Sequence, residues 1–359
     1  MRHGPRLQIF PSWRDNPYLV MLGLAPRAAG YEVLPSVSYN DLTGTMRRLG
    51  AGDILHIHWT SPILQNAPTR NRAKRRLSRL APQLRRLRSR GVSLIWTIHN
   101  RLPHELRYRD EEIALYRLLA ECADRVHIMA PSTPELLADT CVLPPERTVI
   151  IPHPSYSGIY DTGITRAEAR ESFDLNDGDR AVLFLGQIRP YKGVGSLVEA
   201  VDRAGRDRDD LVLMLGGVAK EGSEKGIGEL VPASVRARTL FDFIPDADIA
   251  RWYTAADLTV LPYRAVLNSG SVHLAATFRL PVVVPDEPHL RAQFGGEPWV
   301  AFFDPERPAE SIAELLSDDD LFADVGPESF EPFLGDISPW RVSLAYSALL
   351  AELSAQATQ

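Results

Sequence analysis

Two cations in a short loop, Arg189 and Lys192, are the residues of this chain best suited to chemistry on a phosphorylated ligand. The loop follows the apolar run AVLFL at 181–185, which is closed by Gly186, and it precedes a helical pattern at 195–204. An unbroken apolar run of this kind is typical of a strand buried on both faces of a parallel sheet. Cations between such a strand and a helix N-terminus predict a phosphate site. The alternative is a surface loop with two solvated charges.

A second polar group, Asn268–Ser271, stands where a later helix opens. Its sequence, NSGS, offers hydroxyls and backbone N–H groups that can hold a phosphate at a helix N-terminus. The same residue types cap ordinary helices, so a plain helix cap is the alternative interpretation.

Strands and helices alternate along the chain, which predicts an α/β fold of two Rossmann-like, doubly wound domains facing a central cleft. We expect one domain over 1–165 and a second over 178–335, with a polar, turn-rich linker at 162–178. A last helix within 339–359 should pack back across the domain junction. The expected strands are 6–10, 31–35, 53–59, 93–99, 125–129 and 148–151 in the first domain, and 181–185, 211–215, 239–243, 258–261 and 281–284 in the second. The expected helices include 18–29, 70–90, 111–122, 195–204, 231–238 and 246–256.

The composition is that of a soluble globular protein, with 45% apolar and 24% charged residues in 359 positions. No run of 18 apolar residues occurs, and the start, MRHGPRLQIF, lacks the apolar stretch of a secretory signal. With only two cysteines the fold cannot rest on a disulfide framework. We therefore expect a cytoplasmic protein.

Charge is distributed unevenly between the two halves. Residues 1–160 hold 22 Lys/Arg against 13 Asp/Glu, whereas residues 161–359 hold 18 against 33. Much of the positive excess lies in Arg70–Arg90, which has ten cations, no acid, and leucines at helical spacing. Such a helix can lie on an anionic membrane surface, or it can be a solvated arginine face. Nucleic acid is not an expected partner, because the rest of the chain is acidic.

Taken together, these motifs resemble the GT-B glycosyltransferases, and within them the large retaining family of bacterial surface-glycan enzymes (glycosyltransferase family 4-like). The matching segments are GQIRPYKGV (186–194), AADLTVLPYR (255–264), LNSGSVHLAATFRLPVVVPD (267–286), NPY (16–18), HIHW (56–59), TIHN (97–100) and HPSY (153–156). The resemblance implies a first domain that binds a glycan or lipid-linked acceptor and a second that binds a nucleotide diphosphate sugar. It implies a cytoplasmic hexosyltransferase of surface polysaccharide synthesis, peripheral on the inner face of the membrane if the basic helix docks there.

In this family two cations bind the diphosphate, and Arg189 and Lys192 match them. As the sugar leaves, charge builds on the diphosphate, and cations with helix N-termini can stabilise that charge without a metal. The resemblance therefore implies no metal and no cofactor. It implies donor contacts from Gly186, Asn268, Ser269, Gly270 and Ser271.

His99 ends a first-domain strand, where the family places a histidine that faces the donor sugar. A structural histidine is the alternative. His104 and Glu105 follow in the same loop and, with Asn16, are candidates for acceptor contacts. His56, His58 and His153 also stand at predicted strand ends, and alternation places the first two on one face. Without a cysteine or carboxylate at ligand spacing they do not predict zinc.

The sequence departs from the family near the second-domain helix, where most members carry two glutamates eight positions apart. Val266 and Leu274 stand there instead. His273 is the first candidate to replace the ribose contact, with Glu287 and His289 behind it.

The missing glutamates also weaken the inference of retention. Retention stays favoured, but some GT-B enzymes invert the configuration with an acidic base, and the residues to consider for that role are Asp15, Glu105 and Asp110.

The nucleobase in such folds lies against the segment that follows the third strand of the second domain. Here that segment is 241–245, so Phe243 and Ile244 are candidates for base contacts. Two core phenylalanines of a strand are an equal alternative.

The predicted activity is sugar transfer from a nucleotide-sugar donor to a glycan or lipid-linked acceptor. A binding protein of the same fold without catalysis is the main alternative. A nicotinamide enzyme is disfavoured because PSWRDNPY, not G-x-G-x-x-G, follows the first strand.

Overall fold

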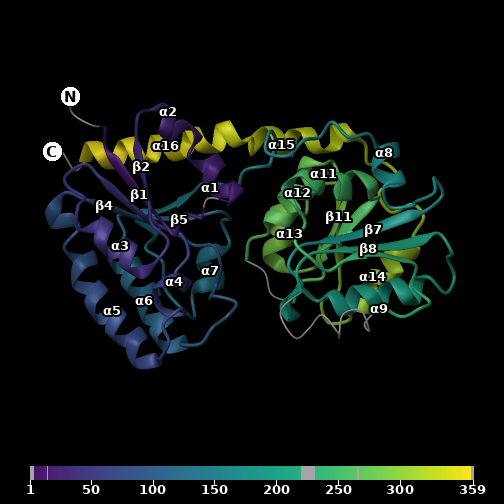
Figure 1. Ribbon diagram of the computed structural model, residues 1–359, viewed down its shortest axis with the longest axis horizontal. Coiled ribbons are helices and arrows are strands. Elements are labelled where there is room, and N and C mark those ends of the chain that lie inside the picture. The colour runs from purple at the N-terminus through teal and green to yellow at the C-terminus, as the bar shows by residue number, and fades with distance from the viewer. Residues whose placement is uncertain (1–3, 14, 220–230, 265–266, 357–359) are drawn as a thin grey trace. The chain divides into compact units, whose positions relative to one another are not determined.

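The computed structural model describes residues 4–13, 15–219, 231–264 and 267–356 (Figure 1). The chain divides into two units. Unit 1 comprises residues 1–154 and 337–359, and unit 2 comprises residues 155–336. Each unit holds one parallel sheet between layers of helices, which confirms the predicted α/β, doubly wound architecture.

The sheet of unit 1 has six described strands in the order β2-β1-β3-β4-β5-β6. Neighbouring strands pair in parallel throughout. The strands are β1 (Arg6–Phe10), β2 (Glu32–Pro35), β3 (Ile54–Ile57), β4 (Ser93–Thr97), β5 (Arg125–Ile128) and β6 (Thr148–Ile150). Both central strands, β3 and β4, are buried along their whole length, and most of their residues are apolar.

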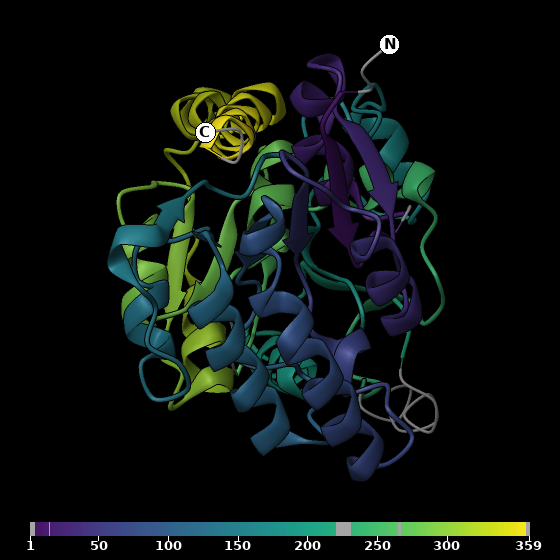
Figure 2. The same cartoon turned by 90° about the vertical axis from the view of Figure 1, so that its left-hand side faces the viewer.

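Helices cover both faces of this sheet. Helices α1 (Pro17–Leu22), α2 (Leu24–Ala28) and α16 (Pro339–Gln356) pack together on one face. Helices α5 (Arg70–Arg85) and α6 (Arg109–Cys122) pack together on the other, where Figure 2 shows them toward the viewer. The remaining described α-helices are α3 (Tyr39–Met46), α4 (Ser61–Leu64) and α7 (Thr133–Leu137).

The last helix, α16, belongs to unit 1 and is fixed there by polar contacts as well as by leucines. The Ser343 hydroxyl donates to the Leu22 carbonyl at 2.8 Å and accepts from the Ala25 N–H at 2.8 Å. Tyr346 on the same helix is fully buried and reaches His56. The segment from 337 onward therefore completes the core of unit 1.

Unit 2 repeats the architecture with the strand order β12-β11-β10-β7-β8-β9, again parallel. Its described strands are β7 (Arg180–Leu185), β8 (Leu211–Gly216), β9 (Ala237–Leu240), β10 (Leu258–Val260), β11 (Val282–Pro285) and β12 (Val300–Phe303). Its described helices are α8 (Arg166–Glu171), η3 (Pro190–Lys192), α9 (Val194–Ala204), α11 (Asp246–Ala255), α12 (Gly270–Thr277), α13 (Pro288–Phe294), α14 (Pro308–Ser317) and α15 (Glu331–Asp336).

Three local predictions in unit 2 differ from the structure. The strand expected over 239–243 begins and ends earlier, at Ala237–Leu240. The helix expected over 231–238 is wrong, because 231–236 forms turns and β9 begins at Ala237. Within the expected linker, 162–178, the structure forms α8. A capping box between Thr165 and Glu168 starts this helix, and Arg170 anchors it by an ion pair of 3.2 Å with Asp257.

Candidate active site

The cation loop of unit 2 is shaped by glycine at a point where no side chain fits. Gly193 lies between η3 and α9 with φ of 67°, and a Cβ there would stand 1.9 Å from the Pro262 carbonyl oxygen. The glycine thus lets the loop press against the segment that follows β10. The Arg264 N–H donates to the Tyr191 carbonyl at 2.9 Å and fixes the same approach. Packing therefore requires a glycine at position 193.

Lys192 is brought to the start of α12 through Tyr263. The Lys192 ammonium lies 3.8 Å from the centroid of the Tyr263 ring, and the Tyr263 hydroxyl donates to Ser271 Oγ at 3.0 Å. Two predicted donor residues from different segments are thus joined by an aromatic ring that the sequence analysis did not single out. The sequence signal that could have pointed to this ring is the LPYR motif, which carries the tyrosine at position 263.

Arg189 begins the same loop and is half-buried. Its Nε and one Nη contact Gln187 Oε1 at 3.4 and 3.3 Å. Both distances are at the long end for a hydrogen bond, so this partner holds the guanidinium weakly. Gly186, which precedes the loop, has φ of 144° and supplies backbone only.

Ser269 is the N-cap residue of α12, but its side chain does not cap the helix. The Ser269 Oγ is buried and has no hydrogen-bond partner among the described residues. Its carbonyl instead accepts from the Val272 N–H at 3.2 Å and from His273 Nδ1 at 2.9 Å. A buried hydroxyl beside the free N–H groups of a helix N-terminus suits an anionic ligand. The plain-cap alternative does not describe this serine.

The other predicted donor residues differ in their burial. His273 is buried against Phe294 and Phe333, and burial lowers the pKa of its imidazole to about 4. Phe243 is 67% exposed, so it is not a core residue, whereas Ile244 is buried beside Gly216. Asn268 and Gly270 are half-buried and flank Ser269.

In unit 1 the predicted catalytic histidine, His99, joins an aromatic cluster at the carboxyl edge of the sheet. His99 Nε2 and His58 Nδ1 are 3.1 Å apart, and the His99 ring stacks on Trp59 with centroids 4.0 Å apart at 18°. The Tyr18 ring contacts His99 edge-on. Burial and the neighbouring histidines hold the pKa of His99 well below its usual range, and burial does the same for His58. Both rings are therefore neutral at pH 7.

Behind this pair runs a relay of buried hydrogen bonds across the sheet. The Ile151 carbonyl can only accept, so His127 Nε2 donates to it at 2.9 Å and His127 Nδ1 accepts from the Thr97 hydroxyl at 2.8 Å. The Thr97 oxygen then accepts from His56 Nε2, and His56 Nδ1 accepts from the Tyr346 hydroxyl, both at 2.6 Å. Burial lowers the pKa of both histidines, to about 4 for His127. The predicted shared face of His56 and His58 is confirmed, since their ring centroids are 3.9 Å apart.

The candidate acceptor residues lie on loops near this cluster. Asn16 caps α1, accepting from the Leu19 N–H at 3.3 Å, so its oxygen is already in use. His104 and Glu105 are exposed, directly after Pro103. Pro103 lines a cavity of about 10 Å³ together with residues of the histidine cluster, which is room for about one water molecule.

Glu112 is a buried carboxylate of unit 1 that the sequence analysis missed. It accepts hydrogen bonds from the side chains of Thr60 and Gln65, and burial raises its pKa. Gln65 Oε1 accepts in turn from the backbone N–H groups of Arg107 and Tyr108, at 2.8 and 3.0 Å. The loop that carries His104 and Glu105 is therefore tied to the interior through this carboxylate.

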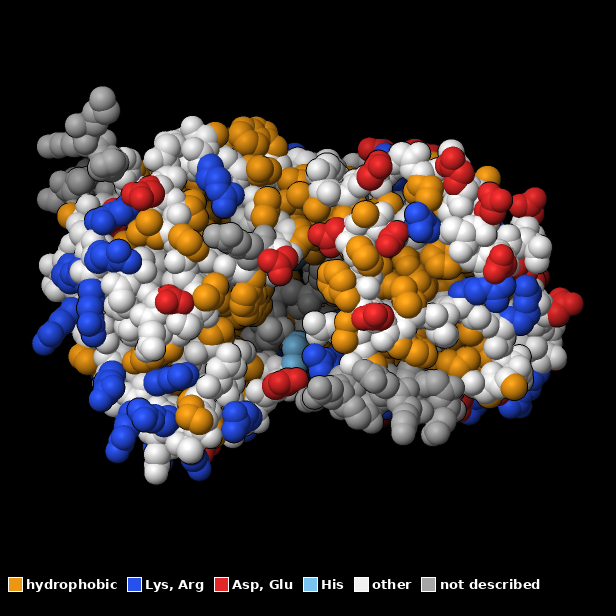
Figure 3. Space-filling model, viewed as in Figure 1, with side chains coloured by type: hydrophobic (Ala, Val, Ile, Leu, Met, Phe, Trp, Pro, Cys, Tyr) orange, Lys and Arg blue, Asp and Glu red, His pale blue; other side chains and the backbone are white. Residues whose placement is uncertain are grey.

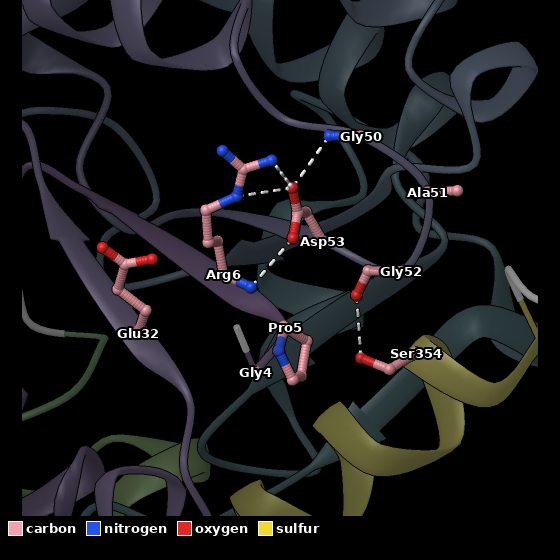
Figure 4. Close-up of a pocket in the computed structure, with 9 residues that line it drawn as sticks. All are labelled: Gly4, Pro5, Arg6, Glu32, Gly50, Ala51, Gly52, Asp53 and Ser354. Carbon is pink, nitrogen blue, oxygen red and sulfur yellow. Dashed lines mark hydrogen bonds and ion pairs between the residues drawn. The ribbon is translucent and has the colours of Figure 1, made fainter. Parts of the chain in front are cut away.

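The opposite edge of the same sheet holds a pocket of about 600 Å³, drawn in Figure 4. One of its two acids, Asp53, accepts from the Gly50 N–H and forms an ion pair of 2.6 Å with Arg6. Ser354 donates to the Gly52 carbonyl at 3.0 Å. These groups satisfy one another at the amino ends of the strands, which is the edge where parallel sheets do not bind ligands.

Across the described ranges, no three His, Cys, Asp or Glu side chains are grouped so that they could hold a metal ion. None of the helices in those ranges is both long enough and apolar enough to cross a membrane.

Comparison with known proteins shows which fold the chain has and which family its second unit matches. Residues 179–318 match the family described as glycosyl transferases group 1. Over 324 residues the chain is 28% identical to a GDP-mannose:glycolipid 4-beta-D-mannosyltransferase of Xanthomonas campestris pv. campestris, covering 87% of this chain and 84% of that protein. It is 28% identical over 261 residues to a D-inositol 3-phosphate glycosyltransferase of Thermobispora bispora, covering 65% of this chain and 59% of that protein.

Two solved structures are similar over the full length. Sucrose-phosphate synthase of Thermosynechococcus elongatus gives a TM-score of 0.73 at 16% identity, with 98% of this chain and 99% of that chain covered. HepE of Anabaena in complex with UDP and glucose gives 0.70 at 14% identity, with 98% and 100% covered. The chain has the GT-B fold, and its residues 179–318 match the group 1 glycosyltransferases. The matched segment contains the cation loop, Tyr263 and the start of α12.

Proposed function

We propose that the chain transfers mannose from GDP-mannose to a glycolipid acceptor in the synthesis of a surface polysaccharide. The observation that carries the proposal is the joining of Lys192, Tyr263 and Ser271 beside the unpartnered Ser269 hydroxyl. It provides a cation, hydroxyls and a helix N-terminus for a diphosphate leaving group. The choice of sugar and acceptor follows the mannosyltransferase relative, which acts on GDP-mannose and a glycolipid.

Donor identity is tested first by binding. A nucleoside diphosphate at a hundred times its Kd should stabilise the protein by about 2.7 kcal/mol. We expect GDP and GDP-mannose to raise Tm, and UDP and UDP-glucose to leave it unchanged. Transfer is then tested with GDP-mannose and glycolipids extracted from the source cells, by mass spectrometry of the product. A Tm rise with UDP alone would reverse the choice of donor.

We propose that the leaving diphosphate is stabilised by Arg189, Lys192 and the N-terminus of α12 without a metal ion. Activity should then be unchanged by EDTA. Activity that EDTA abolishes and Mn²⁺ restores would replace this part of the proposal. After EDTA treatment, Mg²⁺ is added to a second sample in place of Mn²⁺. Activity restored by Mn²⁺ alone would indicate a specific metal, and activity restored by both would indicate a general effect of divalent cations.

For the stereochemistry we propose inversion. The resemblance to the retaining family favoured retention, but two of its glutamates are absent and the relative's name gives a β-linked product. A β product from an α-linked donor requires inversion. Of the acids considered as a base, Asp110 is engaged by Arg70 at 2.5 Å, while Asp15 and Glu105 are exposed. NMR of the product gives its anomeric configuration and decides between inversion and retention. Loss of activity in Asp15→Asn or in Glu105→Gln would identify the base.

We further propose that α5 holds the enzyme on the cytoplasmic, anionic face of a membrane. The side chains of Arg72, Arg75, Arg79 and Arg86 are exposed and have no ion-pair or hydrogen-bond partner among the described residues. At 100° per residue all four fall within about 60° of one another around the helix axis. Figure 3 shows Lys and Arg side chains gathered over the part of unit 1 where Figure 1 places α5.

The other cations of the segment serve a different purpose. Arg70, Arg85 and Arg88 pair with acids on or beside α6, namely Asp110 and Glu111, Glu121, and Asp124. This division provides a matched control. Changing Arg72, Arg75 and Arg79 to Gln should abolish salt-sensitive sedimentation with vesicles of phosphatidylcholine and phosphatidylglycerol, at about 1 kcal/mol per cation. The triple change of Arg70, Arg85 and Arg88 removes the same charge and should bind more than the first variant. Equal loss in both would show a general charge effect without docking by this face.

A further inference from the structure

Three aromatic rings form a continuous stack at the carboxyl edge of the unit 1 sheet. His99 stacks on Trp59, and Trp59 contacts Trp13 with ring centroids 4.9 Å apart and planes 37° apart. The three residues follow β4, β3 and β1, which are neighbours in the sheet. Trp13 ends the stack and is 40% exposed. An indole thus lies at the ligand-binding edge of a parallel sheet with one side packed and the rest open.

The exposed indole is held on a fixed loop. The Ser12 N–H donates to the Ser36 carbonyl at 2.9 Å, and the Ser36 N–H returns a bond to Ser12 Oγ at 3.0 Å. The Asn16 N–H donates to the Trp13 carbonyl at 3.3 Å on the other side. A rigid aromatic surface loses little conformational entropy when a ligand binds to it. Trp13 is therefore preorganised although it contributes only part of its surface to the core.

Two polar atoms inside the cluster lack hydrogen-bond partners among the described residues. His58 Nε2 and the Tyr18 hydroxyl are buried, and neither has a hydrogen-bond partner among the described residues. Their rings lie 5.8 Å apart edge-on, and both rings contact Trp59. Buried polar atoms without partners are rare in folded proteins and mark positions completed by water or ligand. The cluster thus combines an open apolar ring with unsatisfied polar groups behind it.

We propose that Trp13 is the stacking platform for one pyranose ring of the acceptor, backed by Trp59 and His99. A pyranose has an apolar C–H face and a polar rim, and an indole matches the apolar face. The identification of the ligand as the acceptor rests on the proposed transferase function. A purine base could also stack on an indole, but the cations suited to a diphosphate, Arg189 and Lys192, belong to unit 2. The sugar is therefore the occupant to which the proposal commits.

The experiment measures sugar binding without turnover. Saturation-transfer NMR is recorded on the full chain with the methyl glycosides of mannose, glucose and glucuronic acid, and separately with GDP. We expect one glycoside to receive saturation mainly at the C–H groups of one ring face. Trp13→Ala should weaken that binding about tenfold, and Trp13→Phe should keep most of it. Trp340→Ala is the matched control, because Trp340 is an exposed tryptophan of the same unit on α16.

Three results would overturn the platform: no saturation of any glycoside by the unmodified protein, equal saturation in Trp13→Ala, or a GDP signal that depends on Trp13. Circular dichroism of the alanine variant excludes loss of the fold as the cause. Where transfer is observed, Trp13→Ala should raise the KM for acceptor about tenfold and leave the KM for donor unchanged. A chain that binds a glycoside through Trp13 but transfers no sugar would disprove the proposed function and leave the platform intact.

Discussion

Two polar sites of the molecule, the histidine relay of unit 1 and the start of α12 in unit 2, are satisfied in opposite ways. In unit 1 His56, Thr97, His127 and Tyr346 bond to one another, and the relay is complete without a ligand. In unit 2 the Ser269 hydroxyl has no partner among the described residues. The first arrangement stabilises the fold and fixes ring positions, whereas the second carries an energetic cost that a bound anion can offset. The comparison indicates that unit 2 is the part whose stability should respond to a phosphorylated ligand.

The largest effect is expected at the cations of unit 2. Charge-assisted hydrogen bonds that tighten as the leaving group gains charge act on the transition state, so Arg189→Ala or Lys192→Ala should lower turnover by about a hundredfold or more. Steady-state kinetics with the donor at saturation measure this. Arg206→Ala, which removes a surface cation of the same unit, is the control and should keep its activity. Unmodified turnover in both loop variants would remove the diphosphate role from this loop.

The second-largest difference between the two units is expected in their stability at low pH. His56, His58 and His127 in unit 1 are fully buried with lowered pKa values, against His273 in unit 2. Each of these histidines has a folded pKa below its unfolded value of about 6.5. At a pH between those two values the unfolded state binds more protons than the folded state. Stability therefore falls as pH drops from about 6.5 toward 4, by up to about 1.4 kcal/mol per pH unit for each such histidine.

Unit 1 should accordingly lose stability faster than unit 2 in this window. Hydrogen-exchange mass spectrometry at pH 7.5, 6.5 and 5.5, corrected for intrinsic exchange rates, follows peptides of each unit separately. Equal loss of protection in both units, or earlier loss in unit 2, would contradict the neutral relay.

A smaller effect is expected from cutting the relay at its end. Tyr346→Phe removes the donor to His56 Nδ1 and leaves a buried acceptor unsatisfied, at a cost of about 1–3 kcal/mol in the free energy of unfolding. Urea unfolding at pH 7.5 measures it. Leu344→Ala, at an exposed position of the same helix, should cost less. If the two variants were equally stable, the relay would add nothing beyond packing.

The sequence alone predicted those elements whose structure is set by the residues of the segment itself. The buried strands β4 and β7 were predicted from the largely apolar segments 93–99 and 181–185. The helix predicted over 231–238 is not formed, because 231–236 forms turns. Glu112 could not be recognised, because its partners Thr60 and Gln65 are 52 and 47 positions away. Tyr263 was visible in a motif, but its link between Lys192 and Ser271 depends on the tertiary approach that Gly193 permits.

The smallest effect on the free protein, and the most direct test of the comparison, is expected from Ser269→Ala. The Ser269 hydroxyl is buried without a partner among the described residues, so its removal takes away a desolvated group and should leave the unliganded protein equally stable or about 1 kcal/mol more stable. Binding of a nucleoside diphosphate should weaken about tenfold, because a hydrogen bond to a charged oxygen is lost. Thermal shift without and with GDP measures both quantities on one sample. Thr97→Val in the relay of unit 1 should destabilise the free protein, since it breaks two hydrogen bonds that the free protein makes. It should leave GDP binding unchanged, because Thr97 touches no ligand of unit 2. If Ser269→Ala destabilised the free protein and left GDP binding unchanged, the serine would be structural and the contrast between the units would fail.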